Sequence, residues 1–308
     1  MKFLNNNVLN QVLMLFLMLL VGIYASKMKY IDKKMNAGLS NLLLKITLPL
    51  LIINSFITMK FSKSVLNVGE DILLYTLIIH IVLVLFSKFA YMKVNDAQKG
   101  ISKFVTVFSN SGFMGYPVLR SIYGENGVFY CAIFGIILNL FMFSYGIMAL
   151  KNTKGNSLKE LKRAAVNPSI IATVIGFFIF ILKIKLPHLI ALSINSVGSM
   201  TSPLSMIIVG IMLADINLSD LFKDKLVYIL TIVKLLIVPA ITFVVLKLLN
   251  ANQTVIGVIV VLEAMPAASN AAVMSLQYGS DENVALKHIF ITTVLSIIII
   301  PLVIKLVV

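Results

Sequence analysis

Two interruptions in apolar stretches contain the residues of this chain whose types and spacing best suit ligand binding. The first reads Asn110-Ser-Gly-Phe-Met-Gly-Tyr-Pro117, and the second reads Met265-Pro-Ala-Ala-Ser-Asn270. Amides and hydroxyls donate hydrogen bonds, and the first N–H groups of a helix carry about half a positive charge. Such groups suit a carboxylate without any buried lysine, so the ligand expected here is a small organic anion.

A helix cannot run straight through either interruption. Pro117 lacks the N–H that a continuous helix needs, and Gly112 and Gly115 hold a helix poorly. At membrane depth a break survives only where it is buried in protein or lines a watery cavity. We therefore predict a substrate-binding site at the interruptions. Its candidate residues are Asn110, Ser111, Gly112, Pro117, Pro266, Ser269 and Asn270.

Pro117 and Pro266 are each expected to begin the second half of a broken helix, because a proline in first position loses no hydrogen bond. The asparagines have a structural alternative, in which they cap the broken backbone and touch no ligand. The alternative for the glycines is that they permit helices to cross closely.

Charged side chains inside apolar stretches are few, and Lys234 and Glu263 are expected to pair. At 1.5 Å per residue, Lys234 lies about 14 Å from one membrane face and Glu263 about 17 Å from the other, in a core about 30 Å thick. Glu263 is also near enough to Pro266 to respond to cargo or to a coupling proton. The alternative is that each charge finds its own polar partner. His80 is expected to be neutral and bonded to a neighbouring helix, with a proton relay as the alternative, and Lys45 to be structural.

Composition places the chain in a membrane. Of its 308 residues, 59% are hydrophobic and 12% are charged, and the mean hydropathy is +1.01. No globular core buries that much apolar surface. The net charge of +14 would suit nucleic acid, but the lysines fall in short clusters between apolar spans, so no nucleic-acid partner is expected.

Other chemistries lack their signatures. The single cysteine, Cys131, excludes an internal disulfide and offers no metal-ligand cluster. The sequence also holds no metalloprotease, serine-hydrolase or ATP-binding motif. An enzyme is therefore not expected, and neither is a cofactor or a metal.

Ten apolar stretches have the length needed to cross a bilayer. If the N-terminus lies outside, the inside connections hold sixteen Lys and Arg residues and the outside connections hold eight. This excess favours a multi-pass protein of the cell membrane with both termini outside and Lys154 inside. The positive charge that follows the first apolar stretch favours an uncleaved membrane span over a secretory signal peptide. The expected spans are 8–26, 37–58, 70–90, 103–123, 126–149, 166–183, 188–213, 225–248, 252–275 and 283–306.

The ten spans divide five and five, which predicts two repeats, over residues 1–155 and 156–308. An odd number of spans per repeat requires the second repeat to insert upside down. Thr47-Leu-Pro-Leu50 resembles Thr201-Ser-Pro-Leu204 at an offset of 154 residues. The expected fold class is therefore an all-α membrane protein of ten transmembrane helices in two inverted five-helix repeats, broken in spans 4 and 9.

Three groups of residues resemble the auxin efflux carrier family of transporters. They are Asn110 to Pro117, the pair Met265-Pro266 followed by Ser269-Asn270, and Leu48-Pro-Leu50. The family includes plant auxin exporters and bacterial malate or malonate permeases. The resemblance implies a scaffold of spans 1, 2, 6 and 7 and a transport domain of the other spans, in which the broken spans 4 and 9 cross.

The resemblance also implies secondary transport of a small organic anion, a carboxylate or an auxin-like molecule, by alternating access. The expected partners are that anion and the lipid bilayer, with a homodimer as one possible assembly. A sodium-coupled carrier similar to bile-acid symporters is an alternative, and sodium-dependent uptake would indicate it. A channel would show single-channel currents, and a substrate-sensing receptor would bind without flux.

Overall fold

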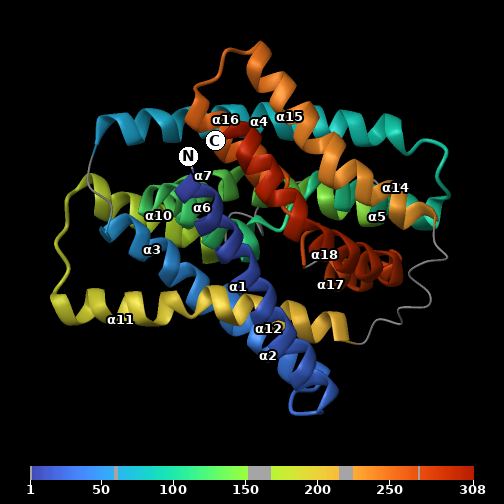
Figure 1. Ribbon diagram of the computed structural model, residues 1–308, viewed down its shortest axis with the longest axis horizontal. Coiled ribbons are helices and arrows are strands. Elements are labelled where there is room, and N and C mark those ends of the chain that lie inside the picture. Colours follow the sequence, from blue (N-terminus) through green and yellow to red (C-terminus); the bar gives the residue numbers. More distant parts are fainter. Residues whose placement is uncertain (1, 59–61, 152–167, 215–224, 270) are drawn as a thin grey trace.

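The computed structural model describes residues 2–58, 62–151, 168–214, 225–269 and 271–308. These residues form helices joined by short connections, and their one isolated β-bridge pairs Ser109 with Ala267 (Figure 1). Four π-helical turns (η) interrupt or adjoin these helices. The first half holds α1 (Lys2–Lys27), α2 (Lys33–Leu42), η1 (Leu43–Thr47), α3 (Leu48–Thr58), α4 (Lys63–Ala90), α5 (Asp96–Val107), η2 (Ser111–Gly115), α6 (Tyr116–Tyr123), α7 (Glu125–Phe141), η3 (Met142–Gly146) and α8 (Ile147–Lys151).

The second half is also helical. Its helices are α10 (Pro168–Ile181), α11 (His188–Ser199), α12 (Thr201–Ala214), α14 (Lys225–Ile232), η4 (Val233–Ile237), α15 (Val238–Leu248), α16 (Gln253–Glu263), α17 (Ala271–Tyr278) and α18 (Glu282–Val307).

Six helical stretches of the described chain are long and apolar enough to cross a membrane. Shorter apolar helices also occur, among them Pro168–Ile181 and Gln253–Glu263. Large apolar side chains are exposed on the outside of the bundle, including Leu189 at 75% and Leu306 at 80%. A surface of this kind is stable in lipid, so the chain is an integral membrane protein. The long stretches are Lys34–Thr58, Lys63–Ala90, Glu125–Lys151, His188–Ala214, Lys225–Leu248 and Glu282–Val307.

Three of the π turns precede a proline. Pro49, Pro117 and Pro239 each lie two residues after the end of η1, η2 and η4. A proline cannot donate to the carbonyl four residues before it, and its ring crowds that carbonyl. The wider π turn accommodates this crowding, and such turns often occur at functional positions. Lys45 and Lys234 both lie inside these turns.

Helices α1 and α12 pack closely against each other, and their crossing depends on glycine. A Cβ atom at Gly22 would overlap the backbone of Ile207, and one at Gly210 would overlap the backbone oxygen of Leu19. Small residues allow helix backbones in lipid to approach closely, because dispersion contacts replace the hydrophobic effect there. Elsewhere α3 packs against both α10 and α11, and α4 packs against α7.

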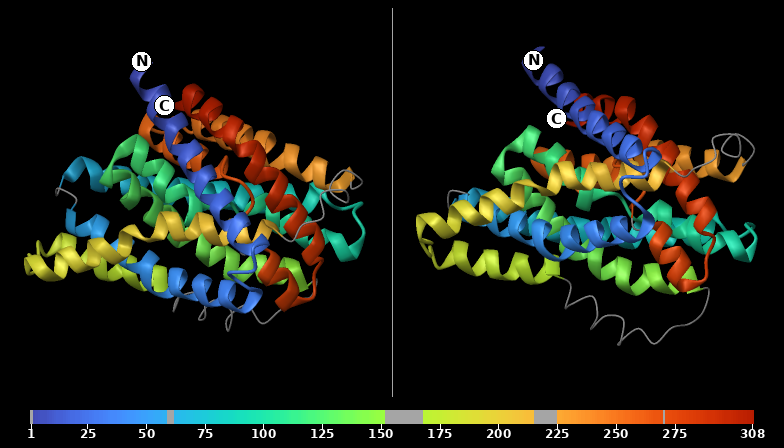
Figure 2. Two further views of the ribbon diagram at one scale, coloured as in Figure 1. Left: turned by 60° about the horizontal axis from the view of Figure 1, so that its bottom comes forward. Right: turned by 90° about the horizontal axis from the view of Figure 1, so that it is seen from below.

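Both ends of the chain lie at the same end of the molecule. Figure 2 shows the N-terminus of α1 and the C-terminus of α18 near each other in two views. The connection between α1 and α2 lies at the opposite end of α1, so we name that end of the molecule the α1–α2 end (Figure 1).

Candidate functional site

The two interrupted segments pair with each other through their backbones. The N–H of Asn110 donates to the carbonyl of Pro266 at 2.8 Å, and the N–H of Ala268 donates to the carbonyl of Phe108 at 3.2 Å. These bonds flank the antiparallel bridge between Ser109 and Ala267. Helix α5 ends at Val107 and α16 ends at Glu263, so each segment leaves backbone groups without helical partners. The segments satisfy these groups in one another, which fixes their relative position.

Asn110 has both a structural and a cavity-lining role. Its Nδ2 donates to Ser269 Oγ at 2.8 Å, and its carbonyl accepts from the N–H groups of Met114 and Gly115 at 3.0 and 3.3 Å. Both side chains are almost fully buried, at 3% exposure for Asn110 and 2% for Ser269. Asn110 therefore joins the two interruptions, and the structural alternative and the binding role are not exclusive.

The two prolines differ from each other. Pro117 lies in the first turn of α6, although η2 already begins helical geometry at Ser111. The carbonyl of Phe113 would accept the N–H that Pro117 lacks, and it accepts from Ser205 Oγ of α12 at 3.2 Å instead. A hydroxyl from another helix thus satisfies the carbonyl that the proline frees.

Pro266 does not begin a helix, which corrects the expectation drawn from the sequence. It lies in the non-helical segment between α16 and α17, and α17 begins at Ala271. The physical reason is the backbone pairing with Asn110, which holds this segment extended. Asn270, another candidate, lies outside the described residues.

A cavity of about 420 Å³ adjoins the paired segments. Asn110, Ser111, Gly112 and Ser269 line it, so the structure brings these four candidates together. It also adds residues that the sequence did not indicate. They are Asn41, Lys45, Ser109, Tyr116, Cys131 and Asn139, with apolar neighbours that include Leu44, Leu138 and Phe143.

Lys45 is a cation on the cavity wall. The sequence suggested a structural lysine that reaches the membrane surface, but the side chain is exposed and lines this cavity. The available signal in the sequence was Pro49, four residues after Lys45, because the π turn η1 precedes this proline and such turns often occur at functional positions.

A second cavity, of about 740 Å³, adjoins the first. The two share Asn41, Leu44, Phe113 and Ser269 in their walls. The second also includes residues of the α1–α2 connection and of the start of α18, among them Lys29, Asp32 and Glu282. The space beside the paired segments therefore continues toward the α1–α2 end.

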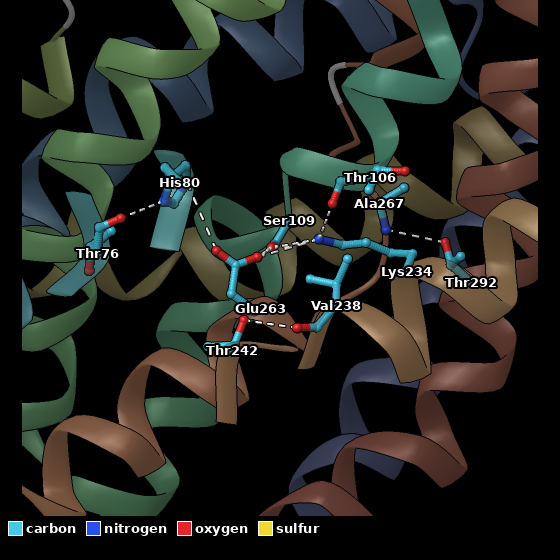
Figure 3. A network of polar contacts seen from close by, with 10 residues as sticks. All are labelled: Thr76, His80, Thr106, Ser109, Lys234, Val238, Thr242, Glu263, Ala267 and Thr292. Carbon is cyan, nitrogen blue, oxygen red and sulfur yellow. Dashed lines mark hydrogen bonds and ion pairs between the residues drawn. The ribbon is translucent and has the colours of Figure 1, made fainter. Parts of the chain in front are cut away.

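Behind the paired segments lies a fully buried ion pair. Lys234 Nζ is 3.5 Å from Glu263 Oε2, and both side chains are 0% exposed (Figure 3). Ser109 links them, because its Oγ donates to Glu263 Oε2 at 2.8 Å and accepts from Lys234 Nζ at 2.9 Å. The structure thus brings together Lys234 and Glu263, the two charges that the sequence places at similar depths in the membrane.

His80 approaches the other oxygen of Glu263. Its Nε2 is 3.9 Å from Glu263 Oε1, while its Nδ1 is 2.9 Å from the carbonyl of Thr76 (Figure 3). The ring is also near the aromatic rings of Phe134 and Phe141, at centroid distances of 5.6 and 5.4 Å. His80 was expected to bond a neighbouring helix, but its hydrogen bond is to its own helix, α4, and its neighbour from another helix is a carboxylate.

Three further asparagines bond in two ways. Asn54, which is buried, donates through Nδ2 to Asn195 Oδ1 of another helix at 3.1 Å. Asn139 instead donates to the carbonyl of Gly135 in its own helix at 2.7 Å. Among the described residues, no group of three or more His, Cys, Asp and Glu side chains could hold a metal ion.

At the end of the molecule opposite the α1–α2 end, an ion pair joins α6 to α7. Arg120 contacts Glu125 Oε1 through Nη2 at 2.6 Å and through Nε at 2.8 Å. Thr58, the last residue of α3, donates to Glu125 Oε2 at 3.4 Å. Glu125 therefore joins α3 to the segment that contains η2 and α6.

The fold and the cavities define an integral membrane protein with internal space for a small solute. The family model described as membrane transport protein matches residues 7–304, and the chain belongs to this family of membrane transporters, the auxin efflux carrier family.

Curated proteins similar to this chain are named as transporters. An uncharacterised transporter of Methanocaldococcus jannaschii is 29% identical over 94% of this chain and 96% of its own length. An uncharacterised transporter of Methanothermobacter thermautotrophicus is 26% identical over 94% of this chain and 95% of its own. The uncharacterised transporter YfdV of Escherichia coli K12 is 20% identical over 88% of each chain.

Proposed function

We propose that this membrane transporter moves a small organic anion by alternating access, as a secondary carrier. The observation that carries the proposal is the cavity of about 420 Å³, in which Asn110, Ser111, Ser269 and Lys45 meet. Amide and hydroxyl donors fix the orientation of a carboxylate, and the ammonium group supplies opposite charge. The volume lies within the range of sites for small ligands.

We further propose two inverted repeats of five spans, divided between a scaffold and a transport domain. Helix packing supports this division. In the scaffold, α1 packs on α12 and α3 packs on α10 and α11, while in the transport domain α4 packs on α7 and α17 packs on α18. The paired segments belong to the transport domain and form its crossing point, as expected for a carrier whose site lies where repeats meet.

The proposed state is open toward the inside. Both cavities extend toward the α1–α2 end, whose connections carry the lysine excess that predicts an inside location. At the other end, Thr58 of the proposed scaffold donates to Glu125 of the proposed transport domain, and Arg120 of the transport domain holds Glu125 in place. Alternating access would break the contact between Thr58 and Glu125 when the cavity opens to the outside.

A thermal-shift screen of mono- and dicarboxylates on purified protein tests the proposal. A carboxylate that binds the folded state raises its Tm by mass action. The best stabiliser is then tested for uptake and counterflow in proteoliposomes. Counterflow supports a carrier, whereas single-channel currents would indicate a channel, and binding without flux would indicate a receptor. Uptake that requires sodium would favour the sodium-coupled alternative.

A variant of Lys45 tests the site itself. Lys45→Met keeps the length of the side chain and removes its charge, so we expect carboxylate affinity to fall by about tenfold or more. Lys247→Met is the matched control, because Lys247 lies near the end of α15 and does not line the cavity. Equal affinities in both variants would remove Lys45 from the site.

A further inference from the structure

Three oxygen atoms surround the ammonium group of Lys234. They are Ser109 Oγ at 2.9 Å, the carbonyl oxygen of Thr106 at 3.3 Å and Glu263 Oε2 at 3.5 Å (Figure 3). All four residues are fully or almost fully buried. We name the three oxygen atoms the oxygen cage. They come from α5, from the segment after it and from α16, whereas Lys234 comes from η4.

The helix break itself supplies one of these oxygens. In an unbroken helix, the carbonyl of Thr106 would accept the N–H of Asn110, four residues later. That N–H donates instead to Pro266 of the opposite segment, which leaves the Thr106 carbonyl free to accept from Lys234. The same backbone pairing that forms the crossing point therefore completes the oxygen cage.

The oxygen cage has the chemistry of a cation site. A carboxylate, a hydroxyl and a free carbonyl are the oxygen ligands that hard cations take. Helices α5 and α16 both end here, and the C-terminal ends of helices add partial negative charge. Such a group of oxygens in a buried site needs a positive partner, because an uncompensated buried carboxylate is strongly destabilising.

We propose that Lys234 is a tethered cation that occupies the oxygen cage in place of a free monovalent ion, so that the crossing segments hold together without sodium. The ammonium group neutralises Glu263. It also donates to Ser109, and so fixes the residue that directly precedes Asn110. The consequence for coupling, that the carrier moves its cargo without sodium, rests on the transport function proposed above. The proposal that Lys234 occupies the oxygen cage does not depend on the transport function.

Removal of the ammonium group should open the oxygen cage to a free ion. Lys234→Ala leaves space beside Glu263 and Ser109, so sodium should bind there and stabilise the variant. We expect the Tm of purified Lys234→Ala to be lower than that of the wild type in choline chloride, and to rise by about 3 °C or more in sodium chloride. The wild type should show the same Tm in both salts.

Two further variants separate this effect from a general effect of salt. Lys234→Ala combined with Glu263→Gln removes the carboxylate, so its Tm should not respond to sodium. Lys234→Met fills the space with an apolar chain of similar length and should also not respond. A folded Lys234→Ala variant that is indifferent to sodium, or a double variant that responds equally, would overturn the proposal.

The wild-type protein provides a test that does not depend on the variants folding. Direct binding of radioactive sodium to purified wild type, measured by scintillation proximity, should be absent if Lys234 fills the oxygen cage. Saturable sodium binding that Glu263→Gln abolishes would show that the wild-type site takes a free ion and would overturn the proposal. Neither measurement uses an organic anion, so a failed search for the cargo leaves this test intact.

Discussion

At the scale of single residues, Asn110 combines a structural bond with a place on the cavity wall. Its Nδ2 donates to Ser269 Oγ at 2.8 Å, and both residues line the cavity. We expect Asn110→Ala to lower the free energy of unfolding by about 1 kcal/mol, the usual value of one such bond. Uptake of the stabilising carboxylate should fall by about tenfold or more, because a donor to a charged ligand is also lost.

Asn195→Ala is the matched control for Asn110→Ala. Asn195 also takes part in an interhelical amide bond, with Asn54 at 3.1 Å, but it does not line either cavity near Asn110. The Asn195→Ala variant should lower the free energy of unfolding by a similar amount and leave uptake close to that of the wild type. If both variants lose uptake in proportion to stability, Asn110 acts only as a structural residue.

The pair of Lys234 and Glu263 should show strong energetic coupling. Each single variant, Lys234→Met or Glu263→Gln, leaves one buried group without its partner, at 0% exposure. We expect the double variant to be more stable than the sum of the single losses implies, by more than about 0.5 kcal/mol. Unfolding in mixed detergent micelles measures the three free energies. Losses that simply add would show that the two charges are stabilised by other partners.

At the scale of helices, Pro117 determines which hydrogen bonds α6 makes. Pro117→Ala restores an N–H that competes with Ser205 for the carbonyl of Phe113. We expect a change in unfolding free energy of less than about 1 kcal/mol, because one hydrogen bond replaces another. Transport should fall further than stability, since a regular helical bond here would change the path of η2 beside the cavity.

Ser205→Ala provides the comparison for Pro117→Ala. It leaves the carbonyl of Phe113 without its hydroxyl partner while proline still prevents the helical bond. We expect a loss of about 1 to 3 kcal/mol, the cost of a buried group left unpaired. The combination of Ser205→Ala with Pro117→Ala should recover part of that loss. A double variant that recovers no stability would exclude the proposed competition.

The crossing of α1 and α12 depends on Gly210. A Cβ at this position would meet the backbone of α1 at Leu19 and Gly22, and backbone cannot move aside as a flexible side chain can. We expect overpacking in Gly210→Ala to lower the free energy of unfolding by about 1 to 3 kcal/mol, and so to lower the Tm. Gly38→Ala is the control, because nothing lies within 4 Å of its Cβ position and alanine favours helix. An unchanged Tm in Gly210→Ala would contradict the close crossing.

How far the sequence predicts the site depends on whether a position follows from regular helix geometry. The depths of Lys234 and Glu263 follow from a rise of 1.5 Å per residue, so their meeting could be expected. Ser109 and Pro266 lie outside regular helices, and their positions follow from backbone pairing between segments far apart in the chain. No local pattern specifies that pairing, and for this reason Ser109 was missed and Pro266 was assigned to a helix start.

At the scale of the whole molecule, the two cavities and the contacts of Glu125 lie toward opposite ends. The shared walls at Asn41, Leu44, Phe113 and Ser269 connect the space beside the paired segments to the α1–α2 end. The contacts of Glu125 with Arg120 and Thr58 join helices at the other end. A carrier with one side open and the other joined in this way would expose its cavity to one side of the membrane at a time.

Reaction with a membrane-impermeant thiol reagent tests this asymmetry. Cys131 lines the first cavity and must first be replaced by serine. In that background, Asn41→Cys, which lies in both cavity walls, should react in inside-out vesicles and not in intact cells. Lys185→Cys, in the exposed connection between α10 and α11, should react in intact cells. Residue Lys154, expected inside, lies outside the described residues and offers a further position for labelling.

Loss of the Glu125 contacts should shift the balance between the two sides. Glu125→Gln weakens the bonds to Arg120 and Thr58 while keeping the shape of the side chain. If these contacts hold the inward-facing state, the combined variant with Asn41→Cys should react severalfold faster from the outside, because its outward-facing population rises. Lys185→Cys should react at an unchanged rate in the same background. Labelling of Asn41→Cys from the outside before Glu125 is changed would reverse the proposed orientation, and a rate that Glu125→Gln leaves unchanged would remove its contacts from the gating step.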